Sequence, residues 1–186
     1  FMAGDYPRAL GNIHTLNAPY FPKSFYPEAE ILQAQIYYAT CQYDNATTVV
    51  ARFQKKYQPI QKSLTAVQAR FNGEGKEEEA LKFFRDLKAG KASVDAEIKP
   101  VVEIALGDRT LLKNLEYVRV LDDEEARFKK APSSFRDSPL GGDVRDALDL
   151  AKGLAVKNAG GLVRDRYQRQ LDELNEHLRD GAKILI

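Results

Sequence analysis

Histidine and cysteine, the side chains that most often bind metals or act as nucleophiles, are scarce in this chain of 186 residues. It has two histidines, His14 and His177, and a single cysteine, Cys41. Glu173 and His177 share one helix face at a spacing of four residues, but two ligands are fewer than a metal site requires. We therefore interpret His177 as part of a solvated helix face and His14 as a half-buried histidine among apolar residues.

One segment offers backbone amides and a lysine in the manner of a phosphate-binding loop, namely residues 71–76, with the sequence FNGEGK. It lacks the longer glycine spacing and the Ser or Thr that follows the lysine in such loops. Three glutamates come next, at Glu77, Glu78 and Glu79. Because their carboxylates would repel a phosphate, we predict a turn between helices, with the acidic residues favouring the next helix N-terminus.

The lone Cys41 excludes an internal disulfide and a cysteine-based zinc site, since each needs at least two thiols. We interpret it as a structural thiol at a position that suits a small residue. The residue types and spacings thus indicate no catalytic residue, no metal site and no cofactor site. We expect a protein that is not an enzyme.

Charge and hydropathy narrow the class of protein further. Lys and Arg number 28 against 27 for Asp and Glu, so the net charge of +1 predicts neither nucleic-acid binding nor attraction to an acidic membrane surface. An apolar content of 44%, with nine Phe and nine Tyr, is typical of a globular protein rather than a disordered one. No apolar run approaches the roughly 18 residues that span a bilayer, so we expect no direct membrane insertion. Because the chain begins with Phe1 and ends on an apolar run in an expected helix, we expect a segment of a longer protein.

The elements that must carry these residues are predicted to be helices. Ala, Leu, Glu, Lys, Arg and Gln dominate the sequence, and β-branched residues do not alternate with polar ones over any long stretch. Straight-chain residues of these types lose little rotamer freedom in a helix. The composition therefore predicts an all-α fold.

An internal period is visible in the first half of the chain. Ala9, Ala46 and Ala80 are 37 and 34 residues apart, and each is followed at four and seven positions by large apolar residues. That spacing places the three on one helical stripe. Further helical segments, residues 28–40 and 61–72, precede the second and third of these helices. A helix pair with one apolar face per helix cannot bury that face alone, so stacked pairs account for the period. The alternative is that three amphipathic helices recur at similar intervals by chance.

Several of these residues resemble tetratricopeptide repeats, in particular the loose repeats of bacterial envelope proteins such as the outer-membrane barrel-assembly lipoprotein and proteins of myxobacterial gliding motility. The residues that carry the resemblance are Gly4-Asp5-Tyr6 with Ala9, and Tyr37, Tyr43, Ala46 and Pro59. Residues 21–29 resemble the turn between repeats of that group. The resemblance covers residues 1–90 and implies an array of helical hairpins, an α-solenoid. Glu30 and Gln33 depart from it, because the family usually has large apolar residues there.

The resemblance also implies a binding surface, because the first helix of each repeat lines a concave groove in that family. Carried over by position, the groove would expose six residues of this chain: Glu28, Ile31, Gln35, Tyr38, Lys62 and Asn72. A partner protein, as a helix or an extended peptide, would bind there. Tyrosines such as Tyr26 and Tyr38 suit recognition because they give large contact area at low entropic cost; alternatively, Tyr20 and Tyr26 pack the linker.

The second half, residues 91–186, is expected to be a helical extension. Two helices are predicted between residues 92 and 131, then a Pro-, Ser- and Gly-rich loop over residues 131–143, then a long C-terminal helix capped by Asp143. That helix has a heptad seam, with Gly181 in one position and large residues at Tyr167, Leu171, Leu174, Leu178 and Leu185. We expect the seam to fold back on the first half; the alternative is that it binds a second chain.

Together these patterns predict a non-catalytic protein-interaction scaffold or adaptor, with a monomer favoured. The alternatives are a structural coiled-coil protein that dimerises through the C-terminal helix, and a helical-bundle enzyme. The resemblance implies a periplasmic or other cell-envelope location in a bacterial assembly or motility complex, with the cytoplasm as the alternative.

Overall fold

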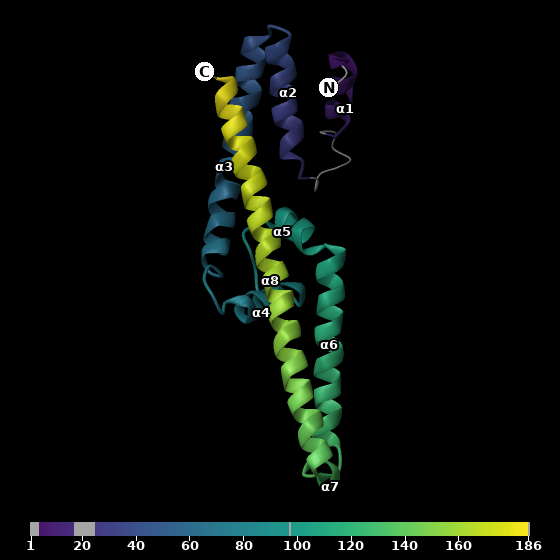
Figure 1. Cartoon of the computed structure of the whole chain (residues 1–186). Helices are drawn as coiled ribbons and strands as arrows, with labels where there is room; N and C mark the ends of the chain where they lie inside the picture. The colour runs from purple at the N-terminus through teal and green to yellow at the C-terminus, as the bar shows by residue number, and fades with distance from the viewer. Residues whose placement is uncertain (1–3, 17–24, 97, 186) are drawn as a thin grey trace. The chain divides into compact units, whose positions relative to one another are not determined.

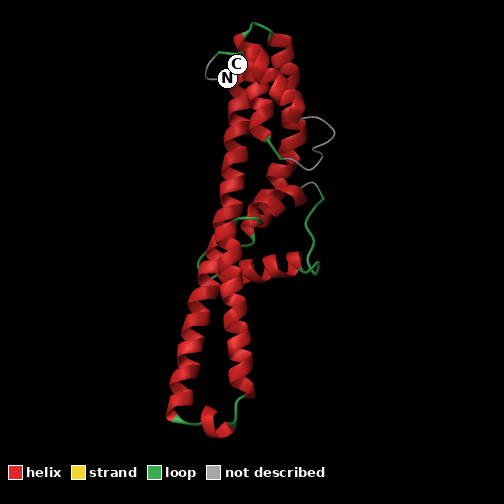
Figure 2. Cartoon of the chain, turned by 90° about the vertical axis from the view of Figure 1, so that its right-hand side faces the viewer, coloured by secondary structure: helices red, strands yellow, loops and turns green. Residues whose placement is uncertain are grey.

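The computed structural model describes residues 4–16, 25–96 and 98–185, and all regular structure in this part of the chain is helical, without a strand (Figures 1 and 2). The all-α fold predicted from the composition is therefore confirmed. In these residues no helix is both long and apolar enough to cross a membrane. The helices are α1 (Tyr6–Leu16), α2 (Pro27–Ala39), α3 (Tyr43–Ala69), α4 (Glu77–Lys88), α5 (Lys99–Leu106), α6 (Arg109–Lys130), α7 (Ser133–Arg136) and α8 (Pro139–Ile184).

The chain forms two compact units that do not follow the order of the sequence. Unit 1 consists of Phe1–Val67, Asp95–Val102 and Gln168–Ile186, and unit 2 consists of Gln68–Val94 and Glu103–Tyr167. Helix α8 therefore contributes its C-terminal part to unit 1 and the rest to unit 2. The division expected from the sequence, residues 1–90 and 91–186, differs from this one because the last helix supplies residues to both units.

In unit 1, α1 packs against α2 through a small apolar cluster. Ile13 of α1 meets Ala29 and Ile36 of α2, and Tyr6, Ala9, Leu10 and Leu32 surround them. Ala9 is half-buried in this contact, whereas Ala46 and Ala80 are buried. Of the turn expected at residues 21–29, residues 21–24 lie outside the described residues, as does Tyr20, and residues 27–29 belong to α2.

Helices α2, α3 and the C-terminal part of α8 lie side by side in unit 1 (Figure 1). Ala34 of α2 packs on Val49 and Val50 of α3, and Ile184 of α8 joins this cluster. Gly181 is buried in the contact: a Cβ atom there would lie 3.1 Å from Cδ1 of Ile31. The C-terminal helix thus folds back on α2 and α3, as preferred from the seam.

Helix α3 is longer than expected. The sequence predicts a repeat that ends near Pro59 and a new helix over residues 61–72, but a single helix runs from Tyr43 to Ala69 with Pro59 inside it. A proline removes one backbone hydrogen bond and costs about 3 kcal/mol in a helix interior. The helix continues because buried side chains on both sides of it, such as Tyr57 and Leu64, hold it against the rest of unit 1.

In unit 2, α6 and the N-terminal part of α8 run antiparallel and side by side (Figures 1 and 2). Val118 and Leu121 of α6 pack on Ala155 and Ala159 of α8, together with Leu81 of α4. The loop predicted over residues 131–143 is wrong in most of its length, because α7 and the first turns of α8 occupy it. A proline in the first turn is compatible with a helix, and Pro139 begins α8.

The N-terminus of α6 is capped by a residue that the sequence analysis missed. The carboxylate of Asp108 accepts hydrogen bonds from the backbone N–H groups of Thr110 and Leu111, both at 3.0 Å. Its other oxygen lies 2.8 Å from the guanidinium of Arg166 on α8. These backbone donors, above all Leu111, and the charge of Arg166 lower the pKa of Asp108. Asp143, predicted to cap the last helix, instead lies inside α8.

Helix α8 passes close to the start of α4 at Gly160. A Cβ atom at Gly160 would lie 1.9 Å from the carbonyl oxygen of Glu77, whereas one at Gly161 would meet nothing within 4 Å. An ion pair of 2.7 Å between Arg164 and Glu77 joins the two helices one turn further on. Packing therefore requires glycine at position 160 but not at position 161.

We expect Gly160→Ala to destabilise unit 2 by about 1 to 3 kcal/mol, because the methyl group forces the α4 backbone away from α8. Gly161→Ala is the matched control, and we expect it to raise stability by about 0.5 to 1 kcal/mol because alanine favours a helix. Urea unfolding followed by circular dichroism measures both. Equal effects of the two substitutions would contradict the close contact at Gly160.

Helices α2 and α4 end in the same hydrogen-bond motif, with a different residue at its left-handed position. Cys41, with φ of 58°, donates its N–H to the Tyr38 carbonyl, and the next residue donates to the Tyr37 carbonyl. Gly90, with φ of 70°, holds the equivalent place after α4. Glycine is the usual residue here, because a Cβ atom strains this conformation. Cys41 is exposed in the turn, so its predicted role as a packed thiol is wrong.

Cys41→Gly should therefore stabilise unit 1 by about 1 kcal/mol or less, since it removes the strain at this turn. The converse change, Gly90→Ala, should cost about 1 kcal/mol for the same reason. Both effects are measured as shifts in the thermal midpoint by circular dichroism. A loss of stability in Cys41→Gly would contradict strain as the dominant effect, and would mean that the hydrogen bond between the thiol and the Tyr43 hydroxyl outweighs it.

Candidate protein-binding groove

A groove with a volume of about 910 Å³ lies between α3 and α8 in unit 1. Residues from two distant parts of the sequence form its walls. Those from α3 are Gln54, Gln58, Gln61 and Lys62, and those from α8 are Asp172, Asn175, Glu176, Leu178, Arg179 and Ala182. We take this groove as the candidate functional site.

The α3 wall consists mainly of uncharged amides. Gln54, Gln58 and Gln61 follow one another at four and three residues, a spacing that places them on one helix face. Gln61 donates a hydrogen bond of 3.1 Å to the side-chain oxygen of Asn175 on α8, which ties the two walls together. In the described part of the chain, Gln54 and Gln58 form no such bond, so their donors and acceptors remain available.

The α8 wall combines charged and apolar groups. Asp172, Glu176 and Arg179 are exposed, whereas Leu178 is half-buried. Exposed charges of both signs give little net field at the groove, because water and salt screen them. The groove therefore offers hydrogen-bonding amides, a small apolar surface and no strongly charged centre.

A buried carboxylate on α2 anchors the opposite side of α3. Glu30 is 4% exposed, and its Oε1 accepts hydrogen bonds from Nζ of Lys56 at 2.7 Å and from the Tyr57 hydroxyl at 3.4 Å. Its second oxygen lies 3.6 Å from Nε of Arg52. Arg52 also donates to the buried amide of Gln33 at 3.1 Å. Glu30 and Gln33, the two residues that depart from the repeat resemblance, are thus buried and pair with side chains of α3.

Titration of this cluster reflects burial and pairing together. Burial opposes the charge of Lys56, but its hydrogen bonds to Glu30 and Tyr57 raise the pKa of the lysine on balance. Burial also raises the pKa of the Tyr57 hydroxyl. Lysine and tyrosine thus both remain protonated at neutral pH, and the cluster acts as a fixed hydrogen-bonded clamp between α2 and α3.

The six binding residues predicted from the repeat resemblance belong to different elements of the fold. Lys62 lines the groove between α3 and α8. Ile31 is 3% exposed and packs toward Gly181, so its prediction as a partner-binding residue is wrong, because α8 covers that face of α2. The remaining four stay predictions: Glu28, Gln35 and Tyr38 lie on α2 of unit 1, and Asn72 is an exposed residue of unit 2.

The predicted seam residues differ in burial along α8. Tyr167, Leu171 and Leu174 are buried, and burial raises the pKa of the Tyr167 hydroxyl. Leu178 is half-buried at the groove, and Leu185 is 45% exposed just beyond the end of the helix. The seam is thus occupied within the chain over its first part and open at its end.

Sequence reasoning missed the amides of the groove. The signal that could have identified them is the run of glutamines at positions 54, 58 and 61, which face one side of a helix without alternating charges. Asn175 carried no signal of its own, because it is 114 residues from its partner Gln61.

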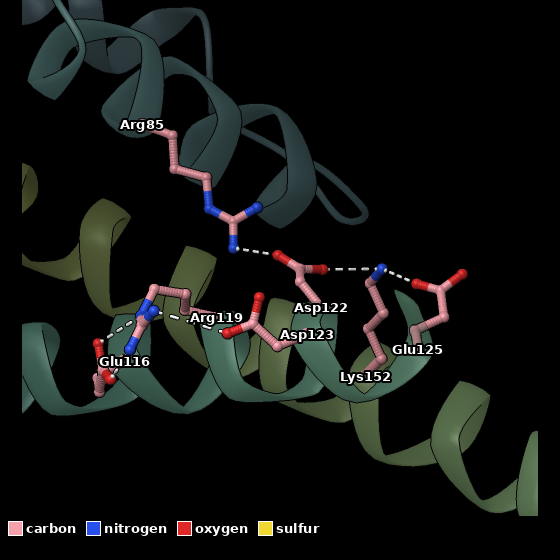
Figure 3. Close-up of polar contacts among 7 residues, drawn as sticks. All are labelled: Arg85, Glu116, Arg119, Asp122, Asp123, Glu125 and Lys152. Atoms are coloured by element: carbon pink, nitrogen blue, oxygen red, sulfur yellow. Dashed lines mark hydrogen bonds and ion pairs between the residues drawn. The ribbon is translucent and has the colours of Figure 1, made fainter. Parts of the chain in front are cut away.

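A second polar cluster lies in unit 2, where α4, α6 and α8 meet (Figure 3). Asp122 of α6 lies 3.0 Å from Arg85 of α4 and 2.8 Å from Lys152 of α8. Glu125 pairs with both Lys152 and Lys129. In this network each carboxylate has a cationic partner, so its geometry suits the joining of three helices rather than the binding of a ligand.

Another ion-pair group lies along α6 alone. Arg119 is 2.6 Å from Glu116 and 3.6 Å from Asp123, at three and four residues along the helix (Figure 3). Such exposed pairs contribute only a few tenths of a kcal/mol each. Within the described residues, no group of His, Cys, Asp and Glu is placed to hold a metal ion.

Comparison of the chain with protein-family models, with curated proteins and with solved structures finds no match.

The pH dependence of unit 2 should follow Glu125. Hydrogen bonds from Lys129 and Lys152 lower the pKa of Glu125 to about 2, below the value of about 4.3 in an unfolded chain. A carboxylate with a lowered pKa contributes stability that is present above about pH 4.3 and lost as the pH falls toward 2.

We expect the thermal midpoint of Glu125→Gln to fall less steeply than that of the wild type between pH 5 and pH 2, at low salt. The neighbouring exposed Glu124 supplies the control, since Glu124→Gln should keep the wild-type slope. Salt should reduce the difference, because it screens exposed pairs. Parallel pH curves for the wild type and Glu125→Gln would show that the pairing contributes nothing.

Proposed function

We propose that this chain is a non-catalytic protein-interaction module, which holds a segment of a partner protein in the groove between α3 and α8. The observation that carries the proposal is the groove itself. Its walls come from residues more than a hundred positions apart in sequence, and Gln61 and Asn175 join them by a hydrogen bond. Its lining offers hydrogen-bonding amides beside exposed charges of both signs.

Rigidity supports this role. Binding a flexible segment costs conformational entropy, and a preformed surface limits that cost to the ligand. The Glu30 clamp fixes α2 against α3, and the contact at Gly181 fixes α8 against both. The groove is therefore held from both sides before any partner arrives.

The arrangement of helices in unit 1 is compatible with a tetratricopeptide-like hairpin array, which we propose as its architecture. Helices α2 and α3 form a hairpin with a tight turn, and Ala46 lies buried as close helix packing requires. The unbroken α3 is the main departure from such repeats. A role as an adaptor in a bacterial envelope complex stays a prediction from the resemblance alone.

The main rival is a coiled-coil protein that dimerises through the C-terminal seam. Leu171 and Leu174 are buried within the chain, so a dimer through them would first have to separate α8 from unit 1. This observation favours the interaction module over the dimer, because the buried seam residues already pack within one chain.

Site-specific crosslinking tests the proposal. A photoreactive amino acid at Gln58 lies in the groove, whereas one at Thr48 lies on an exposed part of α3 that does not line it. In cells that express the natural partners, we expect a discrete crosslinked band from position 58 and none from position 48. The substitution Gln54→Leu in the chain that carries the photoreactive group at position 58 should weaken the band, because it removes one amide of the α3 wall. Identical bands from both positions would contradict binding in the groove.

A further inference from the structure

We infer that the groove between α3 and α8 binds its partner as an extended peptide, and that the amides of Gln54 and Gln58 pair with the peptide backbone. This inference rests on the proposed function and specifies the form of the ligand. It starts from a chemical property of the α3 wall: each glutamine amide carries both a donor and an acceptor, as does each peptide unit. An amide can therefore pair with the N–H and C=O groups of a backbone whatever its side chains are.

The spacing of the two amides fits an extended chain. Gln54 and Gln58 are four residues apart on α3, which is about 6.0 Å along the helix axis at 1.5 Å per residue. An extended peptide advances about 6.6 Å over two residues, and every second residue presents the same edge. Flexible glutamine side chains absorb the small difference. The two amides thus meet two peptide units in the same orientation.

A helical ligand could pair with these amides only through its own polar side chains, because the backbone groups of a helix are paired internally. Covering unpaired polar groups costs free energy, whereas an extended segment supplies a partner for each. The third amide, Gln61, is already held by Asn175 and marks one end of the available wall.

The opposite wall sets what side chains the peptide carries. Side chains of an extended peptide alternate in direction at right angles to its hydrogen-bonding edges, so those that point into the groove meet Leu178 and Ala182. These two residues favour an apolar side chain at that position. Lys62, Glu176 and Arg179 are exposed charges of both signs, which give weak preferences. The ligand is therefore an extended segment with one apolar residue and little sequence preference at its other positions.

Backbone methylation distinguishes this mode from others. Linear random 12-residue peptides are selected for binding to the whole chain, and the best peptide is resynthesised with one N-methyl group at a time. Fluorescence anisotropy then measures each dissociation constant. We expect about tenfold weaker binding when the N-methyl group is at either of two positions that are two residues apart in the peptide, and little change when it is at the position between them.

Two variants of matched size connect the effect to the groove. Gln58→Leu should weaken the unmethylated peptide about tenfold and abolish the extra effect of one of the two N-methyl groups. Gln170→Leu changes a glutamine of α8 in the same unit, outside the groove, and should bind as the wild type does. Unchanged thermal midpoints in both variants establish that the fold is intact.

The outcomes separate this inference from the proposed function. N-methylation tolerated at every position, or an effect equal in the wild type and Gln58→Leu, would overturn backbone pairing. If such a peptide still prevents crosslinking from position 58, the groove remains the binding site and only the extended form fails. If no selected peptide depends on Gln54 or Gln58, the inference is wrong, and the crosslinking result decides the proposed function separately.

Discussion

Close approach between α8 and its neighbours is the constraint on which both units depend. In unit 2, Gly160 lets the α8 backbone meet the first residue of α4 at a distance that no side chain could occupy. In unit 1 the contact at Gly181 is looser: a Cβ atom there would lie 3.1 Å from Cδ1 of Ile31 and in ordinary contact with Val50 and Phe53. This second contact contributes to placing α8 alongside α3, where the groove lies. A larger residue at Gly181 would therefore change the width of the groove as well as the packing.

The buried carboxylate of Glu30 fixes the register of α2 against α3 in unit 1. An apolar residue in place of Glu30 could pack against α3 in several positions, whereas the carboxylate meets Lys56 and Tyr57 in one position only. Removing a carboxylate from water is costly, and its ion pairs in part offset that cost. We therefore regard the cluster as a device for specificity rather than a large source of stability. Loss of one partner would be more harmful than replacement of the whole cluster by apolar residues.

The sequence predicted the helical fold because periodic apolar residues and helix-favouring types are local signals. It failed where tertiary packing overrides local signals: Pro59 does not end α3, and the Pro- and Gly-rich stretch at residues 131–143 is largely helical. The groove could not be predicted, since Gln61 and Asn175 meet only after α8 returns to unit 1. Ile31 shows the same limit, because an apolar residue on a helix face can serve a partner or the core. Only the tertiary fold decides between them.

The two faces of the C-terminal part of α8 connect stability with binding. One face carries Leu171 and Leu174 into the core, and the other presents Asn175 and its neighbours to the groove. A peptide that contacts α3 and α8 together binds only while α8 is docked. By linkage, such a ligand stabilises the docked state by an amount that grows with its concentration relative to its dissociation constant. Under the proposed function, the packing of Leu171 and Leu174 is therefore also the condition for binding at the polar wall of the groove.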